Sequence, residues 1–346
     1  MTMLLPTPRG PVSARLVRTL TGAARDLPVG LGRDLAAGGD PFTDEDLQLT
    51  LHLCYELHYR GFDDVDDRWE WDPSLLALRR TAEDRFESEL RRLVPMSSPL
   101  SARAVPAALT ALVEQDEGPS LSKFLARRAT IEQFREFVTH RSVYHQREAD
   151  PHTWAIPRLA GPAKAALVEI QADEYGGGRL PRMHAELFRV TMRELGLDDT
   201  YGSYLDAVPA VTLATNNLMS LFGLHRRLRG AILGHLAVFE MTSSLPNRRY
   251  GNGLRRLGGN ADATRFYDEH VEADAVHEQI AAHDLCGSFC AEEPDQAPTV
   301  LFGAACALAL DARFSEHVLG RWTAGESSLR DQMPSSGRLL VGALGA

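Results

Sequence analysis

One ten-residue stretch, DEHVEADAVH (residues 268–277), places His270, Asp274 and His277 close together in the sequence. At about 100° per residue of an α-helix, the three side chains fall within an arc of roughly 60°. Two imidazoles and a carboxylate on one helix face are able to reach a single metal ion. The alternative is a polar stripe that faces water.

A carboxylate in an apolar stretch is a second candidate ligand. Glu240 ends the run AILGHLAVFE and lies between Phe239 and Met241. Burial of an unpaired carboxylate is costly, so we expect this one to have a metal ion or another partner.

A third segment carries Glu174 and His184, which are separated by three glycines (residues 176–178) and by Pro181. In one straight helix these ten residues would separate the two side chains by about 15 Å. A break at the glycines lets the chain fold back, and Pro181 is tolerated in the first turn of a following helix. The break allows both side chains to serve one cluster, and an ordinary loop between helices is the alternative.

Together the three segments supply three histidines and three carboxylates: Glu174, His184, Glu240, His270, Asp274 and His277. Helical bundles build such sites from inward-facing residues on several helices. Nitrogen and oxygen ligands without a thiolate favour iron or manganese over zinc. Carboxylates able to bridge suit two ions better than one.

The elements that would position these residues are helical along nearly the whole chain. Apolar residues recur at helical spacing, and we find no convincing run of alternating strand residues and no repeat. The sequence therefore predicts an all-α protein. The expected helical segments are 44–59, 72–94, 101–116, 121–150, 161–175, 182–196, 212–244, 261–289 and 300–322.

The expected domain organisation has three parts. Residues 1–40 are expected to be a flexible tail, because the first 25 residues contain four arginines and no acid. Residues 41–118 are expected to be accessory helices, up to the turn-rich seam QDEGPSL. Residues 119–340 are expected to form the functional bundle.

The composition restricts the partners and the compartment. A net charge of −10 argues against nucleic acid and anionic membrane surfaces. No uninterrupted apolar run approaches the roughly 18 residues that span a bilayer. Of the four cysteines only Cys286 and Cys290 are close in sequence, and their spacing favours buried apolar residues over a redox pair. The absence of a disulfide framework predicts a cytoplasmic protein.

The motifs DEYGGGR…H, RRLRGAILGHLAVFEMTSS and DEHVEADAVHEQ resemble the iron-containing redox enzymes with a haem-oxygenase-like fold, over roughly residues 55–322. The resemblance implies a haem-oxygenase-like helical bundle. It also implies a ligand set in which one core helix supplies Glu174 and His184, a second supplies Glu240, and a third supplies His270, Asp274 and His277. Some members have a further carboxylate three residues before the first-helix histidine, where this chain has Pro181.

The resemblance further implies a nonhaem diiron oxidase or oxygenase, in which two Fe(II) ions and O2 oxidise a substrate held beside them. Family members act on amino acids, fatty acids or their derivatives by N-oxygenation, desaturation, C–C cleavage or ring formation, often in natural-product pathways. We therefore expect a small amino-acid-like or carboxylate substrate. An external electron donor and a second copy of the chain are further candidate partners.

Several residues are weaker candidates. Glu148 and Glu169 are candidates for an additional metal ligand. One of Arg226, Arg227 and Arg229 is a candidate for binding a substrate carboxylate, although the three cannot all face inward. The histidines His140, His145 and His152 are expected to be surface or capping residues.

Three other functions remain open at this point. The same fold also supports haem breakdown, which needs a proximal histidine in a haem-sized pocket, and thiamin-related hydrolysis, which needs a nucleophilic cysteine. A protein that binds iron without catalysis, and whose N-terminal helices recruit a partner, belongs to a different class. This hypothesis predicts that the protein takes up metal but does not consume O2 when a substrate is added.

Overall fold

The computed structural model describes residues 3–24, 26–28, 30–35, 39–95 and 101–330, apart from the side chains of residues 33 and 273–276. Within these ranges the chain is helical, with one isolated β-bridge between Met3 and Phe62 and no strand. The all-α prediction is confirmed. The α-helices are α1 Pro11–Leu20, α2 Glu45–Glu56, α3 Pro73–Leu93, α4 Val105–Glu114, α5 Leu121–Arg127, α6 Ile131–His145, α7 Asp150–Thr153, α8 Gly161–Glu174, α9 His184–Glu194, α10 Ala210–Leu224, α11 Arg229–Arg256, α12 Ala261–Gln279, α13 Ser288–Glu292 and α14 Ala297–Thr323.

Helix starts follow from local chemistry. The Asp44 carboxylate accepts hydrogen bonds from the backbone N–H groups of the first turn of α2, and Asp72 does the same for α3, where Pro73 takes the first helical position. Thr130 and Gln133 form a capping box at the start of α6. This cap divides the single helix expected over residues 121–150 into α5 and α6.

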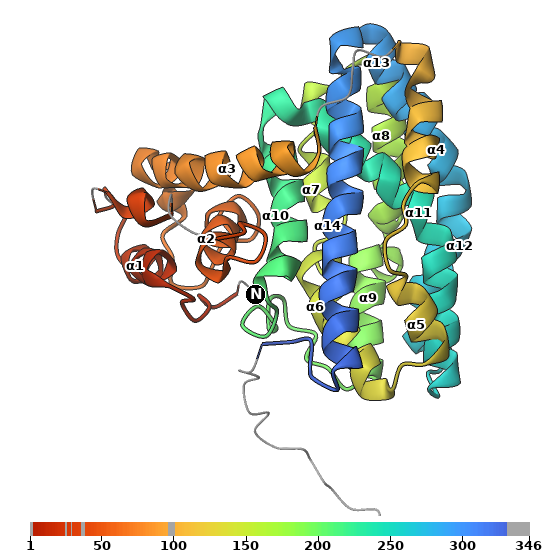
Figure 1. The fold of residues 1–346 in the computed structure, drawn as a ribbon, viewed down its shortest axis with the longest axis horizontal. Coiled ribbons are helices and arrows are strands. Elements are labelled where there is room, and N and C mark those ends of the chain that lie inside the picture. The colour runs from red at the N-terminus through yellow and green to blue at the C-terminus, as the bar shows by residue number, and fades with distance from the viewer. Residues whose placement is uncertain (1–2, 25, 29, 36–38, 96–100, 331–346) are drawn as a thin grey trace, which may run out of the picture.

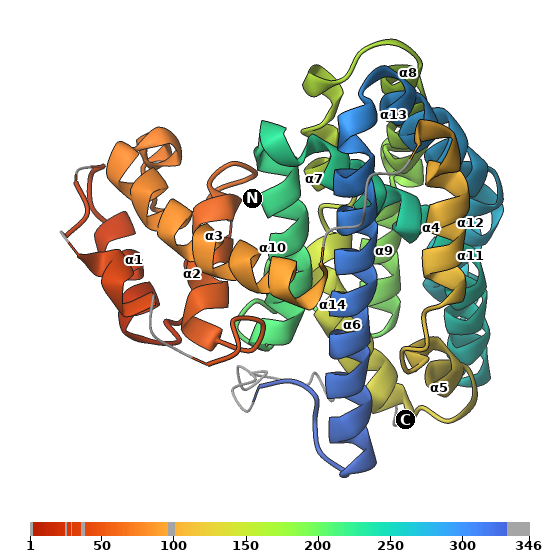
Figure 2. The same ribbon diagram turned by 45° about the horizontal axis from the view of Figure 1, so that its top comes forward.

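Two groups of helices lie side by side (Figures 1 and 2). Helices α1–α3 form an N-terminal lobe that packs against α10, and the remaining helices form the bundle around α11 and α14. Helix α4 lies within the bundle, against α11 and α14. The domain boundary expected at residue 118 thus differs from the structure, because α4 packs on the bundle and not on the lobe.

The expected flexible tail also differs from the structure. Residues 11–20 form α1, whose apolar face (Val12, Leu16 and Leu20) is buried. The Asp46 carboxylate of α2 accepts hydrogen bonds from the N–H groups of Val12 and Ser13, which ties α1 to α2. Two of the arginines that suggested a tail, Arg15 and Arg18, lie on the exposed side of this amphipathic helix.

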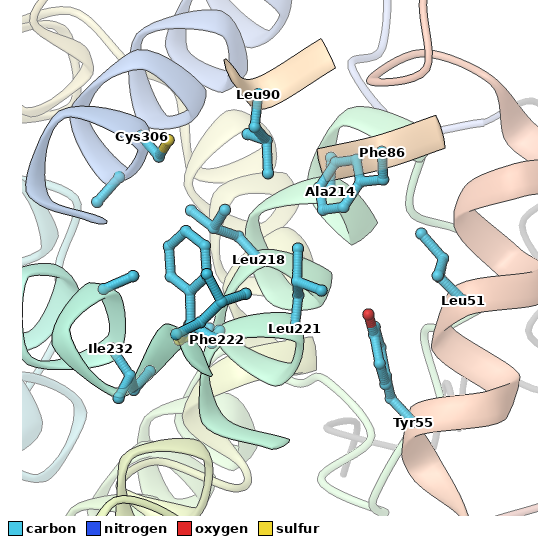
Figure 3. Packing of buried hydrophobic residues seen from close by; sticks show 14 of the residues in the cluster. Leu51, Tyr55, Phe86, Leu90, Ala214, Leu218, Leu221, Phe222, Ile232 and Cys306 are labelled. Atoms are coloured by element: carbon cyan, nitrogen blue, oxygen red, sulfur yellow. The ribbon is translucent and has the colours of Figure 1, made fainter. Parts of the chain in front are cut away.

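One hydrophobic core runs from the lobe into the bundle. Leu51 and Tyr55 of α2 face Leu221 and Ala214 of α10 in Figure 3, and these residues belong to one buried cluster with the core of α11 and α14. This continuity indicates that the lobe and the bundle fold as one unit.

Helix α11 is held against α14 by close backbone contact. A Cβ atom at Gly234 would lie 1.8 Å from the Val300 carbonyl oxygen, and one at Gly303 would lie 2.0 Å from that of Ala231. This close crossing fixes the position of α11 along α14, and α11 carries Glu240. By length and composition alone, residues 294–323 also qualify as a membrane span, but their apolar residues form this packed core.

Candidate metal centre

Two overlapping groups of buried ligand-type side chains lie inside the bundle. One atom each from Glu148, Glu174, His184 and His270 lie within 4.8 Å of one another, and the same holds for Glu174, Glu240 and His277. Glu174 belongs to both groups. Below, Glu148, His184 and His270 are called the first half, and Glu240 and His277 the second half.

The glycine break brings Glu174 and His184 together. Glu174 ends α8 and His184 begins α9, and Glu174 Oε2 lies 3.0 Å from His184 Nδ1. Gly176 has a φ of 62°, and a Cβ atom there would lie 2.5 Å from the backbone of Arg182 and Met183, so only glycine fits.

The path between these two helices differs in detail from the expected one. In both views α8 lies above α9, so the break does not fold the two helices back side by side (Figures 1 and 2). Instead, two short 3-10 turns, Gly176–Gly178 and Leu180–Arg182, connect the helices. They bring the end of α8, with Glu174, close to the start of α9, with His184.

Helices α11 and α12 supply the remaining predicted residues. Glu240 Oε2 lies 3.4 Å from His277 Nδ1. His270 lies seven positions before His277 on α12, and its ring packs against that of His184 at 4.4 Å. Asp274 lies on the same helix, but its side chain is outside the described residues.

Glu148 joins the first half from the turn between α6 and α7. Its Oε1 lies 3.6 Å from His270 Nε2 and accepts a hydrogen bond of 2.7 Å from His145 Nδ1. The other extra-ligand candidate, Glu169, is exposed on α8 and lies in neither group.

Neighbouring groups fix which nitrogen of two histidines faces the centre. Because a carbonyl oxygen only accepts, His270 Nδ1, at 2.8 Å from Phe266 O, carries a proton and leaves Nε2 facing the cluster. His277 Nε2 donates to Asp173 Oδ2 at 3.0 Å, so its Nδ1 faces Glu240. Such outer hydrogen bonds are typical of metal-binding histidines.

The carboxylates and imidazoles of the cluster shift one another's pKa values. Burial alone would raise the pKa of Glu174, but the His184 imidazole holds it below its usual value. Burial lowers the pKa of His277, yet the hydrogen bond and charge of Glu240 and the bond to Asp173 outweigh this and raise it to about 9. His277 is therefore protonated at neutral pH without a metal, and a metal ion that binds its Nδ1 displaces this proton.

Unpaired polar atoms test whether this site fits a metal. Buried carboxylate oxygens and ring nitrogens normally have hydrogen-bond partners. Among the described residues, Glu148 Oε2, Glu174 Oε2, His184 Nδ1 and His277 Nδ1 are buried without a hydrogen bond of proper geometry. They converge on one another instead, which is the arrangement expected of ligand atoms directed at shared ions, and the donor set fits iron.

A cavity of about 560 Å³ opens beside the cluster. Side chains of the cluster and several aromatic side chains line it. Other charged side chains line it as well. The cluster side chains in the lining are Glu148, Glu174, Glu240 and His270. The aromatic ones are Phe137, Tyr144, Phe239, Tyr250 and Tyr267. The other charged ones are Arg141, Arg249, Lys123, Asp116 and Asp311.

The three arginines that precede Glu240 do not line this cavity. Arg227 pairs with Glu87 on α3, and Arg229 pairs with Glu293. Arg226 is exposed. The structure therefore places none of the three at this cavity, and carboxylates distant in sequence hold two of them elsewhere.

The histidines expected at the surface are also corrected. His140 and His152 are buried, and His140 bonds to Thr212 and Ser328 while His152 bonds to His235. His145 is largely buried beside Glu148, and its place three residues before that carboxylate is the sequence signal that identifies it. All four cysteines are buried and free, as expected.

A sequence model described as iron-containing redox enzyme, of haem-oxygenase-like type, matches residues 135–312. The chain belongs to this family. The resemblance inferred from the motifs is confirmed, and so is the haem-oxygenase-like fold. The match covers every residue of both groups and begins after the N-terminal lobe.

A curated relative gives a more specific comparison. The nitrosourea synthase of Streptomyces achromogenes subsp. streptozoticus is 29% identical over 140 residues, which are 40% of this chain and 29% of the relative. The match therefore spans less than a third of that enzyme's length.

Proposed function

We propose that this iron-containing redox enzyme is a nonhaem diiron oxidase or oxygenase that uses O2 to oxidise a small substrate. The observation that carries the proposal is the sharing of Glu174 by two groups of buried ligand atoms. Glu148, His184 and His270 would hold one ion and Glu240 and His277 the other, and Asp274 stays a ligand predicted from the sequence alone. The two irons, when bound, supply electrons and a binding place for O2.

The chain's own part is to hold these ligands and to exclude water. His145 and Asp173 orient Glu148 and His277 by hydrogen bonds. The aromatic side chains that line the cavity beside the cluster lower the local polarity, which strengthens electrostatic interactions of the ligand residues.

The substrate proposed is a small amino-acid-like or carboxylate molecule, because guanidinium groups lie along the same cavity. Arg141 pairs with Asp311 at 2.9 Å, whereas Arg249 donates a hydrogen bond of 3.3 Å to the Ser122 hydroxyl. Arg249 is thus the better placed to bind a carboxylate. N-oxygenation is among the reactions proposed, since the product named for the relative, a nitrosourea, carries an oxidised nitrogen.

The role of Arg249 is testable with its neighbour as a matched control. Arg248 is exposed and does not line the cavity. Once a carboxylate substrate is in hand, Arg249→Met is expected to raise its Kd about 10-fold or more, and Arg248→Met to leave it unchanged. Equal effects of the two substitutions would refute this assignment.

The alternative chemistries of the same fold fit less well. Thiamin-related hydrolysis needs a reactive thiol, but burial raises the pKa of all four cysteines, that of Cys290 to about 11. None of these cysteines lines the cavity. Haem ligation needs a histidine free of competing ligands, whereas His184, His270 and His277 lie among carboxylates.

The experiment that tests the proposal is an anaerobic Fe(II) titration of the metal-free protein, followed by mixing with O2 and stopped-flow absorption. We expect two irons per chain and a transient visible band, both reduced in His270→Ala and Glu240→Ala. Two irons without an O2 reaction, with or without candidate substrates, would favour the non-catalytic iron-binding protein. One iron or none would contradict the diiron proposal.

The compartment, the oligomeric state and the partners of the enzyme are a further part of the proposal. We propose a cytoplasmic enzyme that takes electrons from an external donor, acts as a homodimer and binds neither nucleic acid nor membranes. The net charge of −10 and the buried, free cysteines support this setting.

A further inference from the structure

A buried ion pair joins the N-terminal lobe to the turn that carries Glu148. Glu56, the last residue of α2, accepts a hydrogen bond of 2.9 Å from Arg147, and neither side chain is exposed to solvent. The Tyr201 hydroxyl donates to the other oxygen of Glu56 at 2.8 Å. The Arg147 guanidinium also lies 4.4 Å from the centre of the Tyr59 ring.

Gln146, the residue before Arg147 in this turn, is also held by hydrogen bonds from outside the turn. Arg60 donates to the Gln146 carbonyl oxygen at 3.2 Å, and the Gln146 side chain bonds to the backbone of the 199–202 loop. After Glu148, the positive φ of Ala149 (74°) turns the chain into α7, and Gln171 donates to the Ala149 carbonyl oxygen. Arg147 thus faces the lobe while the next residue, Glu148, reaches the cluster.

This ion pair is poorly explained as a source of stability alone. A buried ion pair seldom stabilises a fold more than apolar residues of similar size would, because both charges lose their hydration. Here two further donors of Arg147, Nε and Nη2, are buried without a hydrogen-bond partner among the described residues. Buried pairs of this kind are best attested as devices that fix one arrangement of the chain.

We propose that the N-terminal lobe positions a metal ligand: the Glu56–Arg147 pair sets the turn that directs Glu148 into the first half of the centre. The inference rests on the proposed metal site and assigns a role to a lobe that lies outside the family match. Glu56 and Arg147 are positioning residues, since they act through Glu148.

The same helix offers a matched control. Glu45, the first residue of α2, pairs with the buried Arg9 at 2.7 Å and accepts a hydrogen bond from the backbone N–H of Ala210. Both members of this pair belong to the lobe, and the hydrogen bond from Ala210 ties Glu45 to the bundle, at the opposite end of α2 from Glu56. Glu45→Gln therefore removes a comparable link without touching the turn.

The test is a Co(II) titration of the full-length, metal-free protein, followed by absorption spectroscopy, for wild type, Glu56→Gln, Glu45→Gln, Glu148→Gln and the Glu56→Gln/Glu148→Gln double variant. Circular dichroism establishes that each variant is folded. We expect Glu56→Gln to weaken binding of one of the two ions by about 10- to 100-fold, as removal of outer-sphere support typically does, and to alter the Co(II) spectrum as Glu148→Gln does. Glu45→Gln is expected to remain within about twofold of wild type.

The double variant separates positioning from a general loss of structure. If Glu56 acts through Glu148, Glu56→Gln adds less than about twofold once Glu148 is replaced. Additive effects, or equal losses in Glu56→Gln and Glu45→Gln, would overturn the inference. If wild type binds no Co(II), the proposed function fails as well; if wild type and Glu56→Gln both bind two ions alike, only this inference fails.

A gentler variant covers the case in which Glu56→Gln does not fold. Tyr201→Phe combined with Arg60→Met removes two supporting hydrogen bonds and keeps the ion pair. We expect about threefold weaker binding of the same ion, in line with the usual contribution of a hydrogen bond. Binding identical to wild type would overturn the inference.

Discussion

The first half of the candidate centre is enclosed by side chains from three segments of the bundle, whereas the second half depends on facing residues of α11 and α12. In the first half, Glu148 is held by the largely buried His145, and His270 by a backbone carbonyl. In the second half, His277 is held by Asp173, whose side chain is 64% exposed. An exposed partner is screened by water and contributes less. From this comparison we expect the first half of the proposed centre to be the more preorganised and to bind its ion more tightly.

The largest effect is expected at the residue that both halves share. Glu174→Ala removes a ligand atom from each group, so both ions should bind at least about 100-fold more weakly, more than loss of an outer-sphere group costs. An anaerobic Fe(II) titration with iron analysis measures this. Retention of one tightly bound iron would show that Glu174 serves one half only.

Single-ligand variants are expected to separate the halves. His270→Ala should weaken the first ion by about 100-fold, and His277→Ala should do the same to the second and leave the tighter first ion in place. Co(II) titrations followed by absorption distinguish the two cases. If both variants lose the same ion, the division into halves is contradicted.

A pH dependence follows from the protonated state of His277. Its pKa, raised to about 9 without metal, means that an ion binding the second half at pH 7 displaces a proton. Affinity for the weaker ion should therefore rise as pH increases, by up to about tenfold per unit, and level off near the pKa. Mn(II) titrations between pH 6.5 and 8.5 test the sign, and an affinity that falls with pH would contradict it.

The smallest effect is expected at the exposed partner. Asp173→Asn removes the charge that supports His277, so the second ion should bind about tenfold more weakly or less, and the first should be unchanged. Glu169→Gln, which replaces an exposed carboxylate on the same helix outside both groups of ligand residues, is the control and should change neither. An effect of Glu169→Gln like that of Asp173→Asn would indicate a general charge effect instead.

Part of this centre follows directly from the sequence. The helical period places His270 and His277 on one face, and a carboxylate in an apolar stretch identifies Glu240 as a buried group in need of a partner. Glu174 and His184 needed the glycine break and the family resemblance as well. These signals are local, and for that reason one chain suffices to find them.

Other features depend on contacts between distant segments. Glu148 is one of two candidates for an additional ligand in the sequence, but it lies in a turn without helical periodicity, so its approach to His270 had no local signal. The partners of Arg227 and Arg229, Glu87 and Glu293, are distant in sequence, and local charge alone suggested a substrate site. Helix α1 was missed because proline, glycine and arginine at the start of the chain resemble a tail until Asp46 is seen to cap it.

The central claim is that two ions share Glu174 in one centre, and X-ray absorption of the anaerobic protein loaded with two equivalents of Fe(II) tests it most directly. Two-metal sites with a common ligand hold their ions about 3.5–4 Å apart. We predict an iron–iron scattering contribution at about this distance, which disappears in Glu174→Ala. Two bound irons without any iron–iron contribution would contradict the shared centre.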